Sequence, residues 1–193
     1  MSIPVIKPKR EDVMKCIARF KDLQGTSDGL PDMSVDGYHR TFYSVLGFEA
    51  PVGDARFSPF GDAVKPKVGH LKTGFGIAFV KAKPGQGVFM HNHDTYETFL
   101  VIDGRWKLEW EGDGGTETVF LDPLDFIAFP VGVQRRFECA DAAAGREEGT
   151  LLGIIGGDHP AAEYSPEAVR VLATHGIMRT VAAQAGRPDF LVE

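Results

Sequence analysis

Residues 85–104 read GQGVFMHNHDTYETFLVIDG. No other stretch of the chain offers as specific a pattern for a site of chemistry. The run contains His91, His93 and Glu97 among residues that favour β-strands. Side chains alternate between the two faces of a strand, so positions 91, 93 and 97 are predicted to converge on one side. Two imidazoles and one carboxylate that face the same way form the donor set of a divalent-metal site with open coordination positions.

The chain after this run alternates short apolar segments with turn residues, which is typical of an all-β sandwich or barrel. Asp103-Gly104 is a strong signal for a hairpin, because a type I′ turn needs positive φ at both of its central positions. A second turn is predicted at residues 112–115. The predicted strands are 76–83, 99–102, 105–110, 116–121, 126–129, 133–139 and 150–155.

Two helices are predicted outside these strands. The first runs from after Pro8 to about Leu23, because apolar residues recur there at spacings of three and four. The second follows Ser165, a natural N-cap, and stops at Gly176. Residues 26–72 hold several glycines and prolines, so they are predicted to form short strands and loops that pack on the main body.

The amino-acid composition is that of a globular domain, and the charge of the chain argues against some classes of binding partner. The 193 residues are 43% hydrophobic and 25% charged, which is the usual balance of a folded domain. The net charge of −6, without a dense basic block, argues against nucleic acid and against an anionic membrane as partners. Cys16 and Cys139 are far apart and form no CxxC motif, so neither a disulfide framework nor a zinc knuckle is indicated. A start without the apolar core of a signal peptide makes a cytoplasmic location the expectation.

The run 85–104, with its two terminal glycines, His-x-His and Glu, resembles the first motif of the cupin superfamily at every position and spacing. The second cupin motif has an acidic turn, a strand, Pro-x-Gly and a histidine three positions after that glycine. Residues 122–137 match the turn, the strand and the Pro-x-Gly. Arg135 stands where cupins usually place the fourth metal ligand.

The resemblance implies a double-stranded β-helix, which is a jelly-roll barrel of antiparallel strands with the site in its mouth. It covers residues 73–157. Residues 1–72 would then form an N-terminal helix and arm packed on the barrel, and residues 158–193 a C-terminal helical tail. In many cupins such arms pack across a dimer, so a homodimer is expected.

Arg135 allows three interpretations, because a guanidinium has no lone pair and cannot ligate a metal. In the first, His91, His93 and Glu97 bind the metal while Arg135 clamps an anionic group of the substrate. In the second, a small register shift turns Gln134 inward to offer its amide oxygen. In the third, the cation has replaced the metal, and the barrel is a non-catalytic binding pocket or a structural relic. The three retained ligands favour the first, although a cation beside a metal is costly unless an anion lies between them.

The resulting hypothesis is a metal-dependent cupin enzyme that acts on a small, anionic organic molecule. Fe(II) is the favoured metal, with Mn, Ni or Zn as alternatives, and a dioxygenase-like oxidation is the expected reaction. The rival hypothesis is a non-enzymatic protein that binds or senses a small molecule. His70 and His39 are candidates for a replacement fourth ligand, and Asp94 or Asp125 could support the histidines from outside the donor set.

Overall fold

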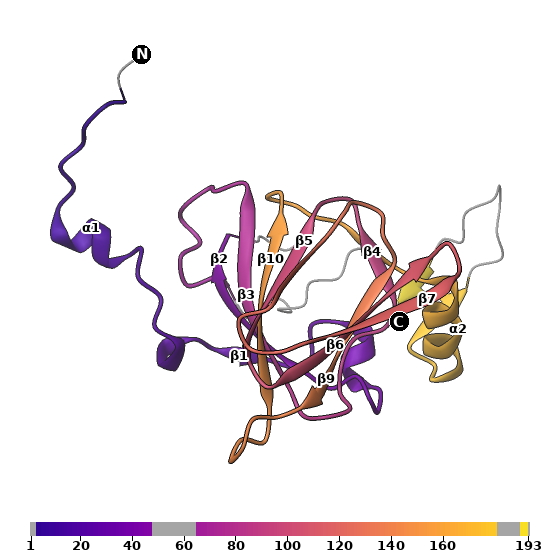
Figure 1. Ribbon diagram of the computed structural model, residues 1–193. Helices are drawn as coiled ribbons and strands as arrows, with labels where there is room; N and C mark the ends of the chain where they lie inside the picture. The colour runs from indigo at the N-terminus through magenta and orange to yellow at the C-terminus, as the bar shows by residue number, and fades with distance from the viewer. Residues whose placement is uncertain (1–2, 48–64, 181–189, 193) are drawn as a thin grey trace.

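Two antiparallel β-sheets face one another in the computed structural model, which describes residues 3–47, 65–180 and 190–192 (Figure 1). The six-stranded sheet contains, in spatial order, β1 (Gly25–Thr26), β2 (Thr41–Leu46), β3 (Phe75–Ala82), β10 (Gly149–Gly156), β5 (Glu97–Asp103) and β8 (Phe126–Phe129). The five-stranded sheet contains β11 (Ala162–Tyr164), β4 (His91–His93), β9 (Arg135–Asp141), β6 (Arg105–Gly112) and β7 (Gly115–Leu121). A separate pair joins β12 (Met178–Thr180) to β13 (Phe190–Val192).

The chain crosses repeatedly from one sheet to the other, as in a jelly roll. β4 belongs to the five-stranded sheet, β5 to the six-stranded sheet, and β6 and β7 again to the five-stranded sheet. β8, β9, β10 and β11 then alternate between the two sheets. This architecture confirms the predicted all-β jelly-roll barrel with short helices near its two ends.

The predicted hairpin at Asp103-Gly104 is wrong. β5 and β6 belong to different sheets and do not pair with each other. Gly104, with a φ of +80°, turns the chain from one sheet to the other, whereas Asp103 keeps a negative φ. A turn signal marks where a strand ends but does not specify the strand that pairs with it. The turn predicted at residues 112–115 is confirmed, because β6 and β7 pair directly around it.

The core lies between the two sheets and consists of side chains from alternate strand positions. Trp106, Leu108 and Val101 are completely buried, and Cys139 joins them as a small filler with 0% exposure. Full burial of each large apolar side chain stabilises the fold by about 1.5–3 kcal/mol. Arg135 continues the inward positions of Cys139 along β9, so the same alternation places a cation inside the barrel.

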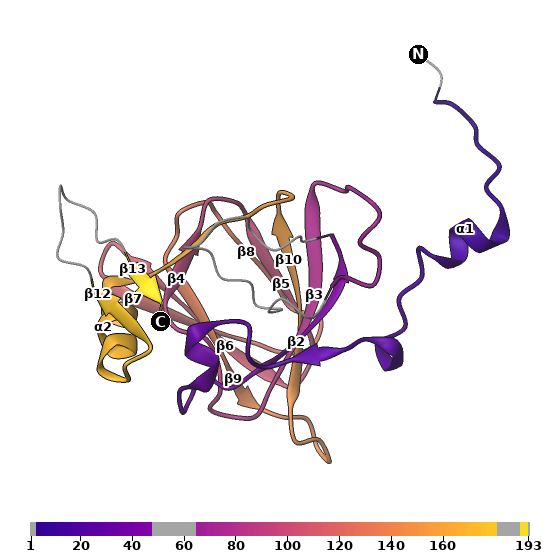
Figure 2. The ribbon, with the colours of Figure 1, turned by 180° about the vertical axis from the view of Figure 1, so that it is seen from behind.

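The long helix predicted between Pro8 and Leu23 is not formed. α1 (Arg10–Met14) has five residues and buries none of them, and the 3₁₀ turn η1 (Phe20–Asp22) follows. The arm leads away from the barrel in both views (Figure 1, Figure 2). A short helix depends on tertiary packing of its apolar face, and α1 buries none of its residues. The arm contacts the barrel further along, where the ring of Phe20 in η1 packs on Tyr43 and Phe79.

The helix predicted after Ser165 is confirmed as α2 (Pro166–Thr174). The Ser165 hydroxyl accepts a hydrogen bond from the Ala168 amide at 3.1 Å, as an N-cap does. α2 packs on a second apolar cluster, in which Leu172 is fully buried and contacts the side of the barrel near Phe89. None of the helices in the described residues is long and apolar enough to cross a membrane.

Both sheets extend beyond the limits of 73–157 that the sequence suggested for the barrel. β2 pairs with β3 and adds an N-terminal segment to the six-stranded sheet. β11 pairs with β4 and adds a C-terminal segment to the five-stranded sheet. Part of the region predicted as short strands and loops, residues 48–64, lies outside the described residues. A segment from each end of the chain therefore joins one of the two sheets, and the C-terminal one pairs with the strand that carries the two histidines.

Candidate metal centre

β4 and β5 bring the three predicted metal-binding side chains together from two sheets. His91 and His93 lie on β4, and Glu97 is the first residue of β5. A bend at residues 94–95 separates the two strands, so the expectation of one continuous strand is wrong. The side chains converge because the chain crosses to the facing sheet between them.

The donor atoms of these residues form a small, largely buried cluster. Their ligand atoms all lie within 4.8 Å of one another. Nε2 of His93 is 3.6 Å from Oε1 of Glu97, and Nε2 of His91 is 4.0 Å from Oε2. The imidazole rings meet edge to face, with centroids 5.1 Å apart. Both Nε2 nitrogens therefore face the same carboxylate.

Backbone carbonyls fix the orientation of both imidazoles. Nδ1 of His91 is 2.8 Å from the carbonyl oxygen of Phe89, and Nδ1 of His93 is 3.0 Å from that of Ala161. A carbonyl oxygen only accepts hydrogen bonds, so Nδ1 carries the proton of each neutral ring. The lone pair is then on Nε2, on the side of the ring that faces Glu97.

The environment also sets the charge of each group. Burial lowers the pKa of His91 to about 4, with a further contribution from His93 and opposition from Glu97. Burial likewise lowers the pKa of His93, against the effect of Glu97. Burial by itself would raise the pKa of Glu97, but the nearby His93, Arg135 and His91 lower it overall. At neutral pH the cluster therefore consists of two neutral imidazoles and one carboxylate.

Arg135 is a buried partner of Glu97. Its Nε and Nη2 donate to Oε2 of Glu97 at 3.1 and 2.9 Å, and its Nη1 donates to the Val133 carbonyl at 3.0 Å. Only 1% of the residue is exposed, and its Cζ lies 5.9 Å from the centroid of the Phe129 ring. The sequence led us to expect a substrate anion as the partner of Arg135, and the structure gives it the protein's own carboxylate.

Gln134 does not replace the missing ligand histidine. Arg135 lies opposite His91 in the pairing of β9 with β4, so the register shift that would turn Gln134 inward is not present. The Gln134 backbone carbonyl accepts from the amide of Glu111 on β6 at 3.0 Å. Its side-chain Oε1 is buried and has no hydrogen-bond partner among the described residues.

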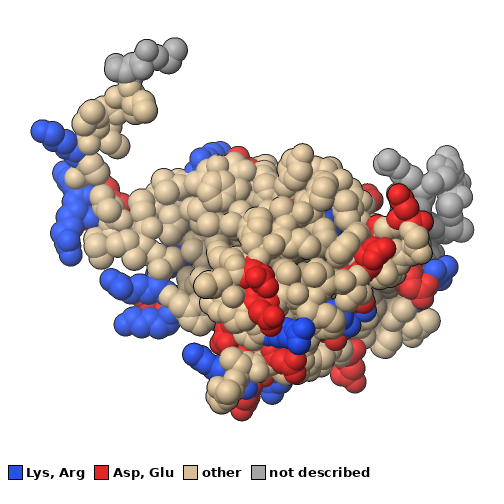
Figure 3. All heavy atoms as spheres, viewed as in Figure 1, with Lys and Arg blue, Asp and Glu red and all other residues tan. Residues whose placement is uncertain are grey.

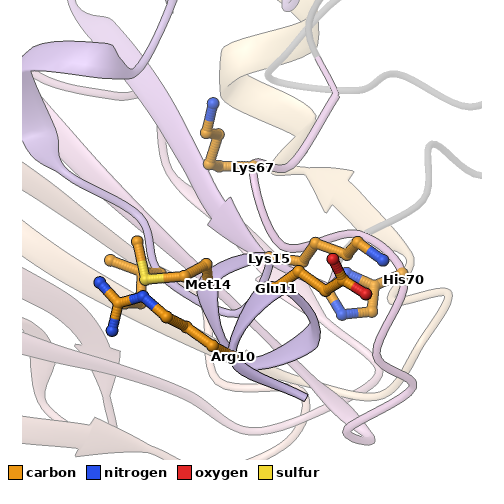
Figure 4. Close-up of a pocket in the computed structure, with 7 residues that line it drawn as sticks. Arg10, Glu11, Met14, Lys15, Lys67 and His70 are labelled. Carbon is orange, nitrogen blue, oxygen red and sulfur yellow. The ribbon is translucent and has the colours of Figure 1, made fainter.

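The two other candidates for a fourth ligand also have partners elsewhere. Nδ1 of His39 contacts the Met33 carbonyl at 2.8 Å. His70 lies beside the N-terminal arm, with its Nε2 3.6 Å from Sγ of Cys16. His70 lines a surface groove of about 860 Å³, and Figure 4 shows it there beside Glu11 and other side chains of the α1 region. Neither histidine joins the cluster on β4 and β5.

Residues that support the histidines were only partly predictable. Asp94 does contribute, but indirectly, because its Oδ1 accepts from the amide of Ala161 at 2.7 Å. Asp125 instead accepts from the Asp122 amide within its own turn at 3.0 Å. The carbonyls of Phe89 and Ala161 were missed, since a backbone group leaves no signal in the side-chain pattern.

These residues fit a divalent cation. The site supplies two oriented Nε2 lone pairs and a carboxylate oxygen, in the protonation states that metal binding requires. Oε1 of Glu97 faces His93, while Oε2 holds Arg135. One carboxylate can therefore offer an oxygen to a metal and keep its ion pair with the other.

Two comparisons of the sequence gave no match to this chain. No protein-family model matches it, and no curated protein matches it closely enough to count as similar.

Solved structures give a likeness of fold. An oxalate decarboxylase from Lactobacillus farciminis, in a formate complex, aligns with a TM-score of 0.50 and 13% identity over 78% of this chain and 36% of that chain. An oxalate oxidase aligns with a TM-score of 0.43 and 17% identity, over 50% and 48% of the two chains. A vicilin from tomato, Solanum lycopersicum, gives 0.42 and 14%, over 48% and 26%. This chain thus spans between about a quarter and a half of those chains, and at such identities the likeness concerns the fold alone.

Proposed function

The chain has the fold of the cupin superfamily, and from this premise we propose that it is a metal-dependent enzyme acting on a small anionic molecule. The observation that carries the proposal is the arrangement of His91 and His93, whose Nε2 atoms both face Glu97. This is the 2-His-1-carboxylate donor set, which favours Fe(II), with Mn, Ni or Zn as alternatives. When bound, a divalent ion supplies Lewis acidity and, in the case of Fe(II), electrons for reaction with O₂.

The charge of the site favours an anionic substrate. Arg135 neutralises Glu97, and both imidazoles are neutral at pH 7. A divalent cation added to this set leaves two uncompensated positive charges at a largely buried site. Such charges are costly at low dielectric unless an anion accompanies them, and a carboxylate or similar group of the substrate meets that need.

Arg135 has two roles in this proposal. It holds Glu97 in its ionised form, and once a metal shares that carboxylate, the guanidinium adds to the positive charge that attracts the anionic group of the substrate. The short contacts to Glu97 make the first role independent of any substrate. The second role is the one expected from the sequence, in which Arg135 binds an anionic group of the substrate. In the absence of substrate, the partner of Arg135 is Glu97.

Metal content and oxygen consumption test the proposal together. The protein is purified without a metal-affinity tag, reconstituted anaerobically with Fe(II) and assayed for O₂ uptake with a panel of small carboxylates that includes oxalate. For the wild type we expect about one metal ion per chain and substrate-dependent O₂ uptake. Glu97→Ala should lose both. His159→Ala, which changes an exposed histidine outside the cluster, should keep both. Failure of Fe, Mn, Ni and Zn to bind would contradict the proposal.

A second function, a non-catalytic barrel that binds a small molecule, is favoured by one observation. The Arg135–Glu97 ion pair already satisfies the carboxylate that a metal would use. In this case the protein would bind an anion with no metal in the site, and Arg135→Ala would abolish that binding. Stoichiometric metal with turnover decides for the enzyme, and anion binding by the metal-free protein without metal uptake decides for the binder.

We further propose that the protein forms a homodimer through the outer face of the six-stranded sheet. Paired positions place an apolar row across this face, on the side opposite the core, formed by Tyr43, Phe79, Leu152, Leu100 and Phe126. Phe20 of the same chain already packs on Tyr43 and Phe79, which leaves Leu152, Leu100 and Phe126 for a partner. The protruding arm adds apolar side chains that are almost fully exposed, such as Val5 at 90%, beside the lysines and arginines visible in Figure 3. A second copy would bury both surfaces.

The mass in solution tests this dimer. Light scattering after size exclusion is expected to give twice the chain mass of 21.0 kDa. Phe126→Asp places a charge on a side chain that is 58% exposed, so it should disrupt the dimer without disturbing the core. A wild-type protein that elutes as a monomer would contradict the proposal.

A further inference from the structure

His91 is held by a chain of hydrogen bonds that ends at an aspartate outside the donor set. Its Nδ1 donates to the carbonyl of Phe89 at 2.8 Å, and the Phe89 amide donates to Oδ2 of Asp32 at 3.3 Å. Asp32 lies in the 3₁₀ turn η2 (Pro31–Ser34), about sixty positions before the histidine. An N-terminal segment thus fixes the residue that orients this ring.

His93 is held by the same arrangement from the other end of the chain. Its Nδ1 donates to the carbonyl of Ala161 at 3.0 Å, and the Ala161 amide donates to Oδ1 of Asp94 at 2.7 Å. The Asp94 amide returns a bond to the Ala161 carbonyl at 3.3 Å. In both cases one intervening residue accepts from the imidazole and donates to an aspartate.

Asp32 itself is locked in place. It is completely buried, and its Oδ1 accepts from Nη2 of Arg40 at 2.9 Å and from the Tyr164 hydroxyl at 2.8 Å. Burial and the nearby Asp32 raise the pKa of Tyr164 well above its usual value, so the phenol stays protonated and donates. Tyr164 is also the β11 residue that pairs with His91 on β4.

We propose that Asp32 and Asp94 are positioning residues for the metal-binding histidines, Asp32 for His91 and Asp94 for His93. This inference rests on the proposed function of metal binding. Neither aspartate bonds to its histidine directly. Asp32 acts on His91 through Phe89, and Asp94 acts on His93 through Ala161. Partners of this kind keep a ligand ring at the correct angle and its proton on the correct nitrogen, and their loss typically costs about 10–100-fold in metal affinity.

Three variants test the two aspartates separately. Asp94→Ala removes the acceptor for the Ala161 amide, whereas Asp94→Asn keeps an oxygen there and serves as its matched control. Asp32→Asn is not used, because it would leave Arg40 as an unpaired buried charge. Tyr164→Phe takes its place as the test of His91, since it removes one hydrogen bond from Asp32 and keeps the ion pair of Asp32 with Arg40. The readouts are the imidazole ¹⁵N NMR signals of the metal-free protein and a titration with Co²⁺.

We expect each variant to affect one histidine. Asp94→Ala should shift the ring signals of His93, leave those of His91 in place, and weaken Co²⁺ binding by about 10–100-fold, with Asp94→Asn near wild type. Tyr164→Phe should shift the signals of His91 and leave those of His93.

Two results would overturn the inference. One is Asp94→Ala with unchanged His93 signals. The other is an equal disturbance of both rings by Asp94→Ala and by Tyr164→Phe, which would indicate general loosening. A wild-type protein that binds no Co²⁺ would instead refute the proposed function, while the signals of the metal-free protein still decide whether the aspartates position the rings.

Discussion

His91 lies directly opposite Arg135 in the antiparallel pairing of β4 with β9. Both side chains are buried, with exposures of 8% and 1%. The register therefore places a permanent cation beside a histidine that is neutral because of its burial. Glu97 compensates the charge of Arg135, because its carboxylate accepts hydrogen bonds from the guanidinium and also faces the imidazole of His91. The behaviour of the site should follow from this shared carboxylate.

Replacing Arg135 with alanine should destabilise the metal-free protein by about 3–5 kcal/mol, because Glu97 would become a buried charge without a partner. Added Zn²⁺ should recover part of that loss by supplying a new cation. The measurement is the shift of the melting temperature on addition of Zn²⁺, which we expect to be larger in Arg135→Ala than in wild type. Equal shifts in the two proteins would show that the ion pair does not compete with the metal.

Arg135→His should tighten metal binding, because it replaces a cation with a neutral imidazole at the position opposite His91. We expect the affinity for the metal to increase at least about tenfold. A tenfold increase corresponds to about 1.4 kcal/mol, whether it comes from lost repulsion or from a new coordination bond. Competition with a chromophoric chelator measures it. An affinity at or below that of wild type would mean that the β9 position does not reach the metal.

His91→Ala and His93→Ala should each abolish stoichiometric metal retention. Each removes one oriented Nε2 donor from a set of three, and the remaining pair does not complete the facial arrangement. Elemental analysis after dialysis gives the metal content directly. His175→Ala is a suitable control, since Nδ1 of His175 contacts the Val171 carbonyl at the end of α2, away from the cluster. Loss of metal in that control would point to non-specific binding.

The metal-free protein should lose stability as the pH falls below about 6.5. The pKa of His91 is lowered in the folded state to about 4, so between these values the unfolded chain binds a proton that the folded chain does not. Stability therefore rises with pH across this window, by up to about 3 kcal/mol from His91 alone. The pKa of His93 is also lowered by burial, so His93 acts in the same direction over this window, whereas Glu97 adds to the loss only below its ordinary pKa of 4.5. Urea unfolding at pH 7 and pH 5 measures the difference.

A variant without this titration provides the control for the pH experiment. His91→Gln has no ionisable group at position 91, so its stability should depend less on pH over the same window. If wild type and His91→Gln lose the same free energy of unfolding between pH 7 and pH 5, His91 is not the group responsible.

The sequence was most informative where function and local geometry are encoded in the same short segment. The donor set of His91, His93 and Glu97 was predicted from spacing, and strand 126–129 and helix α2 from turn and cap residues. The reasoning that joined the donors was nevertheless incorrect, since they come from two strands and not from one. A period of two describes which residues share a face but does not reveal a bend between sheets.

Contacts between distant segments were beyond the reach of the sequence. Nothing in the pattern of residues indicates that β11 pairs with β4, or that Glu97 is the partner of Arg135. The apolar spacing between Pro8 and Leu23 predicted a helix, but a helix of this kind forms only where another surface covers its apolar side. These features depend on tertiary structure, which a single sequence does not display.

Gly104→Ala should cost more stability than Gly85→Ala, although both glycines have a φ of +80°. The backbone penalty of positive φ is about 1–2 kcal/mol at either position. At Gly104 a Cβ would also lie 2.6 Å from the carbonyl oxygen of Asp141, whereas at Gly85 it would meet no atom of the described residues within 4 Å apart from its chain neighbours. The crowding at the corner between β5 and β6 should add about 1–3 kcal/mol. Urea unfolding of the two variants measures the difference, and equal losses would show that the corner can move to accept a methyl group.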